Sequence, residues 1–462
     1  SCGAVLRLPG PPEGKEDWGY VTVRDGAHMF WWLYYADSPS SKNVVEVREI
    51  NVLVCPGRSG GSGTGFGNFE EIGPLDGDLQ PRDTTWVQSA SVLFVDNPVG
   101  TGFSYTNRPD AFATNVSTVA SDMLVLLRSF FSSRDDFQTI PFYIFSESYG
   151  GKMAAAISLE LTKAIAKGSI KCNFAGVALG DSWISPLDSV LTWGPYLYTT
   201  SLLDDPGLAE VNGVAQQVKA AVEQGQFLKA TELWSQAENA VERNTNNVNF
   251  YNILTQDPDE KVSATPGEDF ISLQWRRHLA RLHKQPLSEL MNGPIRKRLN
   301  VIPENVTWGG QSNEVFSNMA GDFMRPVVDI VDQLLSAGVN VTVYNGQLDL
   351  IVDTMGQELW VKRLQWEGLP YFNKLLWTPL YDPASPGLTG AFYKTYKNFS
   401  FYWILRAGHM VLSSPPIITP VMCERVLYRP IGTLGYINIT YRAHLSISVS
   451  PTCSLLSPQR CL

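Results

Sequence analysis

The sequence lacks the short patterns that mark metal-binding and nucleotide-binding proteins. Its six cysteines include no pair with C-x-x-C spacing, so we expect no zinc site and no other bound metal. The glycine-rich stretch 57–67 lacks the Gly-Lys-Ser/Thr ending of a phosphate-binding loop. We therefore expect the protein to work without a metal or an organic cofactor.

Positive charge and long apolar runs are scarce as well. The 36 lysines and arginines are outnumbered by 45 aspartates and glutamates, which leaves no basic footprint for nucleic acid. No run of 18 apolar residues is present, so no membrane span is expected. Apolar residues make up 44% and aromatic residues 11% of the 462 positions, as in chains that bury a core. This length suits one large domain with an insertion, or two domains.

Several features indicate passage through the secretory pathway. The chain begins with Ser1 rather than Met, as after removal of a signal peptide, and the six cysteines are compatible with disulfides whose pairing their spacing does not determine. Asn-x-Ser/Thr tripeptides also arise by chance, but five of them together favour a secreted or lysosomal glycoprotein. The candidate glycosylation sites are Asn115, Asn305, Asn340, Asn398 and Asn438.

Strand and helix patterns alternate along much of the chain, which predicts a mostly parallel sheet with helices on its faces. Strand patterns occur at 18–35, 91–95, 142–145, 174–179, 339–344 and 399–404, and helical patterns at 120–131, 151–166 and 326–335. Between the fourth and fifth strand patterns, residues 207–243 and 269–299 read as helices. We therefore divide the chain into a first core part (1–181), a helical cap insertion (182–320), a second core part (321–415) and a C-terminal tail (416–462).

A candidate nucleophile lies between a strand and a helix. Ser146-Glu-Ser148-Tyr-Gly-Gly151 follows the apolar residues 142–145 and precedes the helical pattern at 151–166. Small residues around Ser148 allow the sharp turn that exposes a serine hydroxyl above a sheet, and the helix N-terminus favours negative charge there. As a bare pattern S-x-S-x-G is weak, but its place between strand and helix makes it more specific.

A serine nucleophile needs a base, and the base needs an acid to orient it. Asp349 follows the strand pattern 339–344, and His409 follows 399–404. Sites of open α/β sheets form at the carboxyl ends of strands, and the order Ser, Asp, His is that of the α/β-hydrolase fold. We therefore expect an α/β-hydrolase fold with a helical cap insertion. Asp353, four residues beyond Asp349, is interpreted as a loop or helix-cap residue.

Four segments together resemble the serine carboxypeptidase family, over residues 13–43 and 60–411. They are Asp96-Asn-Pro-Val-Gly-Thr-Gly-Phe-Ser-Tyr105, Ser146–Gly151, Asn345-Gly-Gln-Leu-Asp349 and Ala407-Gly-His-Met-Val411.

The resemblance implies a role for each matching residue. It implies Ser148 as nucleophile, Asp349 as orienting acid, His409 as base and the backbone N–H of Tyr149 as an oxyanion donor. It also implies that Glu147 and Glu71 bind the carboxylate of a peptide with a free C-terminus. Carboxyl groups that meet a third carboxylate must share protons, so we expect exopeptidase activity at acid pH.

The sequence departs from the family in two places. Where the family has Gly-Gly-Pro-Gly, this chain has Gly57-Arg58-Ser59-Gly60, which assigns the second oxyanion N–H to Arg58; Pro56 occupies a position that assists carboxylate binding. After His409 the proline-containing tail shows no closing helix. Two alternatives follow: a non-catalytic, carboxypeptidase-like secreted glycoprotein with an impaired oxyanion hole, or an esterase or acyltransferase on the same fold.

Overall fold

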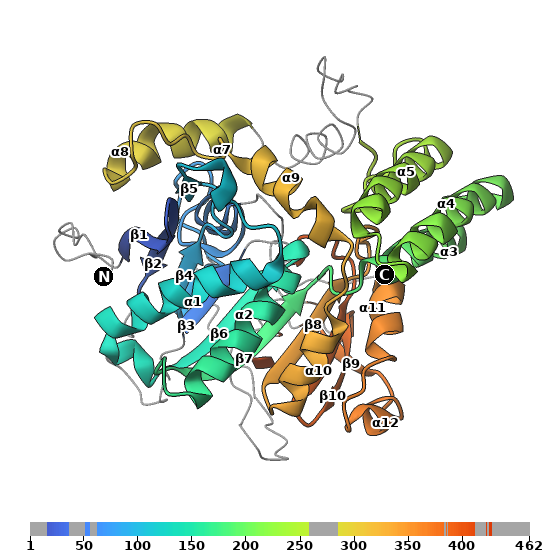
Figure 1. Cartoon of the computed structure of the whole chain (residues 1–462). Helices are drawn as coiled ribbons and strands as arrows, with labels where there is room; N and C mark the ends of the chain where they lie inside the picture. Colours follow the sequence, from blue (N-terminus) through green and yellow to red (C-terminus); the bar gives the residue numbers. More distant parts are fainter. Residues whose placement is uncertain are drawn as a thin grey trace, which may run out of the picture. The chain divides into compact units, whose positions relative to one another are not determined.

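The computed structural model describes residues 16–36, 51–55, 62–257, 285–382, 385, 387–411, 422, 425 and 426. Eleven strands of this part pair into one sheet, in the order β1-β2-β4-β3-β6-β7-β8-β11-β10-β9, with β5 beside β2 (Figure 1). The strands are β1 Glu16–Arg24, β2 Ala27–Tyr34, β3 Asn51–Cys55, β4 Ser91–Val95, β5 Tyr105–Thr106, β6 Pro141–Glu147, β7 Asn173–Gly180, β8 Asn340–Gly346, β9 Thr378–Tyr381, β10 Thr389–Tyr396 and β11 Phe399–Ile404.

The centre of the sheet is parallel and its two borders are antiparallel. Strands β4, β3, β6, β7, β8 and β11 pair in parallel, whereas β1, β2, β9 and β10 pair antiparallel. Helices cover both faces of a parallel sheet, and its strands are therefore apolar almost throughout. In β4, for example, all five residues are buried.

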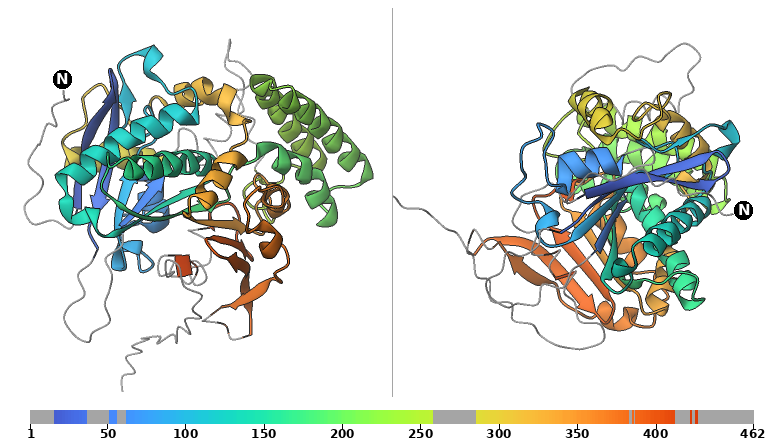
Figure 2. Two further views of the ribbon diagram at one scale, coloured as in Figure 1. Left: turned by 60° about the horizontal axis from the view of Figure 1, so that its bottom comes forward. Right: turned by 90° about the vertical axis from the view of Figure 1, so that its left-hand side faces the viewer.

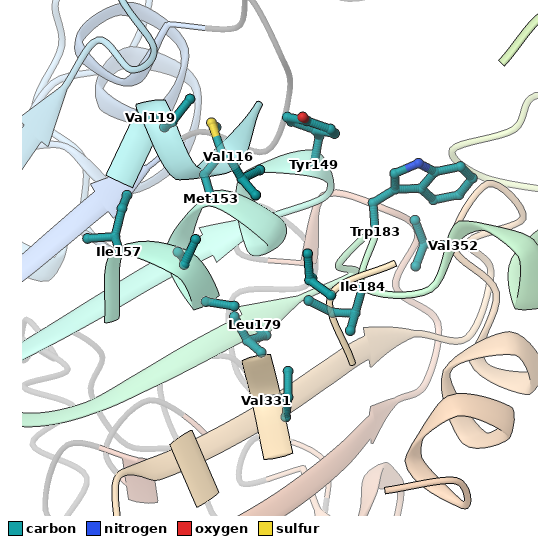
Figure 3. Packing of buried hydrophobic residues seen from close by; sticks show 14 of the residues in the cluster. Val116, Val119, Tyr149, Met153, Ile157, Leu179, Trp183, Ile184, Val331 and Val352 are labelled. Atoms are coloured by element: carbon teal, nitrogen blue, oxygen red, sulfur yellow. The ribbon is translucent and has the colours of Figure 1, made fainter. Parts of the chain in front are cut away.

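Successive side chains of the central strands pack into two separate cores, because side chains alternate between the faces of a sheet. In β6, Phe142 and Ile144 belong to the core that also contains α1 (Val116–Ser133), α2 (Tyr149–Ala166) and α10 (Val328–Ser336). Figure 3 shows part of this core, with Met153 and Ile157 of α2 near Leu179 of β7. Tyr143 and Phe145 face the second core, which residues from 287 to 308 cover.

A helical block separates β7 from β8. Its helices α3, α4 and α5 pack side by side beyond one end of the sheet, and α9 contacts α5 (Figures 1 and 2). The described helices of the block are α3 Pro186–Thr199, α4 Asp205–Glu223, α5 Phe227–Thr245, α7 Gln285–Leu290, α8 Arg296–Leu299 and α9 Ser312–Phe323; α11 Thr354–Val361 and α12 Leu369–Phe372 follow β8.

The expected alternation of strands and helices is confirmed, and the sheet flanked by helices is parallel at its centre but mixed as a whole, because its borders are antiparallel. The helical pattern 207–243 forms two helices, because the chain turns at Gly225, whose φ of 71° is a glycine conformation. Of the helical pattern 269–299, residues 269–284 lie outside the described residues. The domain boundaries at 181, 320 and 415 stay a prediction.

The described part of the chain bears on the expected absence of a membrane span and on the pairing of one cysteine. Within the described residues, no helix is long and apolar enough to cross a lipid bilayer. Of the six cysteines, Cys172 has a described side chain, and its thiol forms no disulfide.

Helix α2 is tied to α9 by a buried ion pair. The Lys152 ammonium group is fully buried; it donates to the backbone oxygen of Asp322 at 2.6 Å and lies 3.2 Å from that residue's carboxylate. The Tyr149 hydroxyl donates to the same carboxylate at 2.9 Å. Burial lowers the pKa of Lys152 to about 8, against the raising effect of Asp322. The first turn of α2 is therefore held by a polar network inside the protein.

Replacing Lys152 with Met should destabilise the protein by about 3–5 kcal/mol, because it leaves the Asp322 carboxylate buried without its cation. The measurement is urea unfolding. Lys163→Met on the same helix is the matched control: its pair with Glu160 is about half exposed, so solvent screening limits the cost to about 0–1 kcal/mol. Equal losses in the two variants would contradict the assigned role of the buried pair.

Candidate active site

Ser148 occupies a strained turn between β6 and α2. Its φ of 55° and ψ of −131° lie outside the regions that residues with a Cβ favour, and such strain is held only by the surrounding structure. Here the backbone N–H of Ser148 donates to the backbone oxygen of Gly180 at 3.0 Å. The backbone oxygen of Ser148 accepts from the N–H groups of Gly151 at 3.0 Å and Trp183 at 2.9 Å. The hydroxyl makes no capping bond to α2. It therefore sits, half-buried, at the N-terminus of an 18-residue helix.

Gly151 lets α2 approach the loop after β7. A Cβ at this position would lie 2.1 Å from Oγ of Ser182, closer than real contacts allow. A larger residue would push the first turn of α2 away from that loop. The second glycine of the Ser146–Gly151 segment thus has a steric reason that the sequence pattern alone does not reveal.

His409 and Asp349 meet at the same edge of the sheet. Asp349 lies in the loop after β8 and His409 in the loop after β11, and both are buried. Nδ1 of His409 is 2.7 Å from Oδ2 of Asp349. Because an ionised carboxylate only accepts, Nδ1 carries the proton and donates it to this bond, so Nε2 has the lone pair that a general base requires.

A segment of the helical block holds both of these loops through its backbone. The Phe250 oxygen accepts from the N–H groups of Leu350 and Ile351, both at 3.0 Å, and the Tyr251 oxygen accepts from the His409 N–H at 2.8 Å. The Tyr251 ring also lies against the imidazole, with 5.2 Å between ring centroids. Gly408 is required here, because a Cβ would lie 2.3 Å from the Tyr251 oxygen. Sequence reasoning missed this segment, which lies outside any periodic pattern.

Asp181 is a third carboxyl group at this edge, and sequence reasoning missed it too. It is the first residue after β7 and is fully buried. Its oxygens, those of Asp349 and the ring nitrogens of His409 include three atoms within 4.8 Å of one another. Three such atoms resemble a cation site, but a metal on Nδ1 would have to displace the proton that bonds His409 to Asp349. The usable signal was its position, since Asp181 directly follows an apolar strand just as Ser148 does.

Of the remaining predicted residues, some have a described position and others lie outside the described residues. Glu147, the last residue of β6, and Glu71, in the helical segment Gly63–Ile72, are both buried. Tyr149 begins α2, and its ring stacks on Phe323 with 5.8 Å between centroids. Arg58 and Pro56 lie outside the described residues. Asp353 is confirmed as a helix cap, because its carboxylate accepts from the Gly356 N–H at 3.0 Å.

The candidate glycosylation sites differ in what their side chains do. Asn305 is exposed in the loop between α8 and α9. Asn115 caps α1 through its oxygen, and Asn340 donates to the Ala175 oxygen at 2.9 Å. The Asn398 amide donates to two backbone oxygens, those of Leu335 at 3.0 Å and Val339 at 2.8 Å. Asn438 lies outside the described residues.

Comparison with known proteins gives a consistent result. The family model described as serine carboxypeptidase matches residues 7–429. Retinoid-inducible serine carboxypeptidase from Homo sapiens is 61% identical over 416 residues, which cover 89% of this chain and 91% of the human protein. Serine carboxypeptidase-like 51 from Arabidopsis thaliana is 41% identical over 440 residues, 90% of this chain and 93% of the plant protein.

Among solved structures, the prohormone-processing carboxypeptidase Kex1(delta)p from Saccharomyces cerevisiae matches with a TM-score of 0.74 and 17% sequence identity, over 89% of this chain and 91% of the yeast chain. At that identity the similarity establishes the fold alone, and it confirms the expected α/β-hydrolase fold. The sequence relatives and the family model go further. The chain belongs to the serine carboxypeptidase family of serine hydrolases.

Proposed function

We propose that this protein is a serine-type carboxypeptidase that releases C-terminal amino acids from peptides through an acyl-enzyme on Ser148. The observation that carries the proposal is the buried 2.7 Å contact between His409 and Asp349, at the strand edge where the strained turn presents Ser148. An imidazole oriented in this way is a base that can activate a serine.

The proposed reaction follows from the direction of each hydrogen bond. Nε2 of His409 takes the Ser148 proton while Oγ attacks the last peptide carbonyl, and Asp349 stabilises the imidazolium that forms. Negative charge on the carbonyl oxygen is met by the N–H of Tyr149 at the start of α2, with Arg58 as the proposed second donor. The imidazolium then protonates the leaving amine, and a water activated by the same imidazole releases the peptide from Ser148.

Selection for a free C-terminus is assigned to Glu147 and Glu71. Glu147 directly precedes Ser148. A substrate carboxylate bound by the Glu147 side chain would therefore lie next to the peptide bond that Ser148 attacks. The segment that carries Glu71 packs against β3 and β4, beside β6. Two buried carboxyl groups accept a third carboxylate only while protons are shared among them. We therefore propose that the enzyme acts at acid pH, which suits a lysosomal or secreted location.

A fluorophosphonate probe should label the parent protein at Ser148, because it reacts with serines activated by a neighbouring base. Ser148→Ala should abolish labelling and lower kcat by about 10⁴-fold or more. Ser158→Ala, a buried serine on the same helix, should leave both unchanged. Mass spectrometry of the labelled peptide identifies the site. An unlabelled, inactive parent would favour a non-catalytic carboxypeptidase-like glycoprotein instead.

The pH dependence separates a carboxypeptidase from an esterase or acyltransferase. With an N-blocked dipeptide, kcat/KM should fall from about pH 5 to about pH 8, because Glu147 and Glu71 lose their shared proton and repel the substrate carboxylate. The C-terminal amide of the same dipeptide carries no charge there, so its kcat/KM should be lower at acid pH and should not fall over this interval. A rate of C-terminal release that climbs across the interval would reject the acid-pH proposal.

Glycosylation tests the proposed passage through the secretory pathway. We expect Asn305 to be modified, because its side chain is exposed, whereas Asn398 uses both amide hydrogens inside the protein. In protein secreted from a eukaryotic host, Asn305→Gln should lose the mass of one glycan, and Asn398→Gln should lose none. A glycan found on Asn398 but not on Asn305 would contradict this expectation.

A further inference from the structure

The carboxyl group of Asp181 is held rigidly beside the proposed catalytic pair. Its backbone takes the unusual φ of 40°, and its N–H donates to the Tyr344 oxygen at 2.8 Å. Its Oδ1 accepts from the Gly346 N–H at 2.8 Å. Oδ2 receives no N–H or O–H from a non-acidic group of the described residues, and the side chain is in hydrogen-bond contact with Asp349. The bonds to Tyr344 and Gly346 therefore hold the Asp181 side chain in place beside Asp349.

Two carboxyl groups in contact away from water cannot both be ionised, so the hydrogen bond between them requires a proton. Asp349 accepts from Nδ1 of His409 and, at 3.3 Å, from the Val352 N–H, which stabilise its ionised form. Asp181 has one backbone donor, and among the described residues no lysine or arginine forms an ion pair with it. Burial, and then the Asp349 charge, raise the pKa of Asp181 well above its ordinary value. The proton therefore belongs to Asp181.

We propose that Asp181 is a positioning residue for the reaction: its neutral carboxyl group donates a hydrogen bond to Asp349 and fixes the orientation of that carboxylate toward His409. The proposal rests on the proposed function of Ser148, Asp349 and His409. It assigns the donor role to Asp181, since Asp349 accepts from Nδ1 of His409 and its carboxylate is in hydrogen-bond contact with the Asp181 carboxyl group.

Asparagine separates a neutral donor from an anion at this position. In Asp181→Asn, the amide oxygen can accept from Gly346 while the amide N–H₂ donates to Asp349, so kcat and KM should stay close to the parent values for an N-blocked dipeptide. Asp181→Ala removes the donor, and kcat should fall by up to about a hundredfold with little change in KM, because a shift of about 1 Å at a reacting group costs that much.

Asp353→Asn is the matched control. It neutralises a second buried aspartate near the same loop, whose carboxylate accepts from Thr192 and Gly356, and asparagine still caps α11. Its kcat and KM should match the parent values. A loss of kcat in Asp353→Asn as large as in Asp181→Ala would overturn the proposal, because any buried carboxyl in this region would then be needed.

The charge of Asp181 is read from the titration of His409, followed by NMR of proteins labelled in the histidine rings. If Asp181 is neutral, Asp181→Asn leaves the His409 titration and the rising limb of kcat/KM at the parent pH. If Asp181 is an anion, its neutralisation removes a charge that favours imidazolium, so both move to lower pH and the proposal fails. The NMR result stands even if the parent protein releases no C-terminal residue, an outcome that would sink the proposed function instead.

Discussion

The register of four parallel strands is the constraint on which the site depends. Glu147 of β6 pairs with Gly180 of β7, Gly180 with Tyr344 of β8, and Tyr344 with Tyr402 of β11. Side chains beyond these residues therefore emerge along one line, although they are far apart in sequence. Ser148 and Asp181 follow their strands directly, and Asp349 and His409 follow after a few more residues. A one-residue slip in any of these pairings would turn the strand's side chains to the other face and break this line.

Backbone hydrogen bonds from one distant segment help to fix the loops that leave this edge. Residues 250–253 lie between α5 and the next described helix, yet their backbone groups bond Leu348, Leu350, Ile351 and His409. The helical block is thus part of what holds His409 and Asp349 in place. Such bonds place few demands on the sequence, because every residue except proline supplies both a backbone N–H and a carbonyl.

This difference explains what the sequence could and could not predict. Strands and long helices follow from the period of their apolar residues, and Asp349 and His409 were found because each follows a strand in the order that the fold requires. The role of the segment around Tyr251 could not be predicted from the sequence, since backbone hydrogen bonds require no particular pattern of side chains. Asp181 went unnoticed because a single aspartate after a strand is also an ordinary turn residue, and its meaning comes from a partner 168 positions away in sequence, at Asp349. The break between α4 and α5 at Gly225 was not predicted, because the apolar pattern is helical on both sides of it.

The proposals about this edge all depend on the protonation states of its carboxyl groups and of the imidazole. Asp349 has to stay ionised to hold the Nδ1 proton of His409, which a neutral Asp181 permits and an ionised one would oppose. His409 has to be neutral to act as base, so activity requires the pH to lie above the range in which the imidazole holds a second proton. Glu147 and Glu71 have to keep a shared proton to receive the substrate carboxylate, so activity also requires the pH to lie below their deprotonation. On the proposed mechanism the working pH interval is therefore bounded by the imidazole on its acid side and by the glutamate pair on its basic side, while Asp181, which is fully buried beside Asp349, stays neutral throughout.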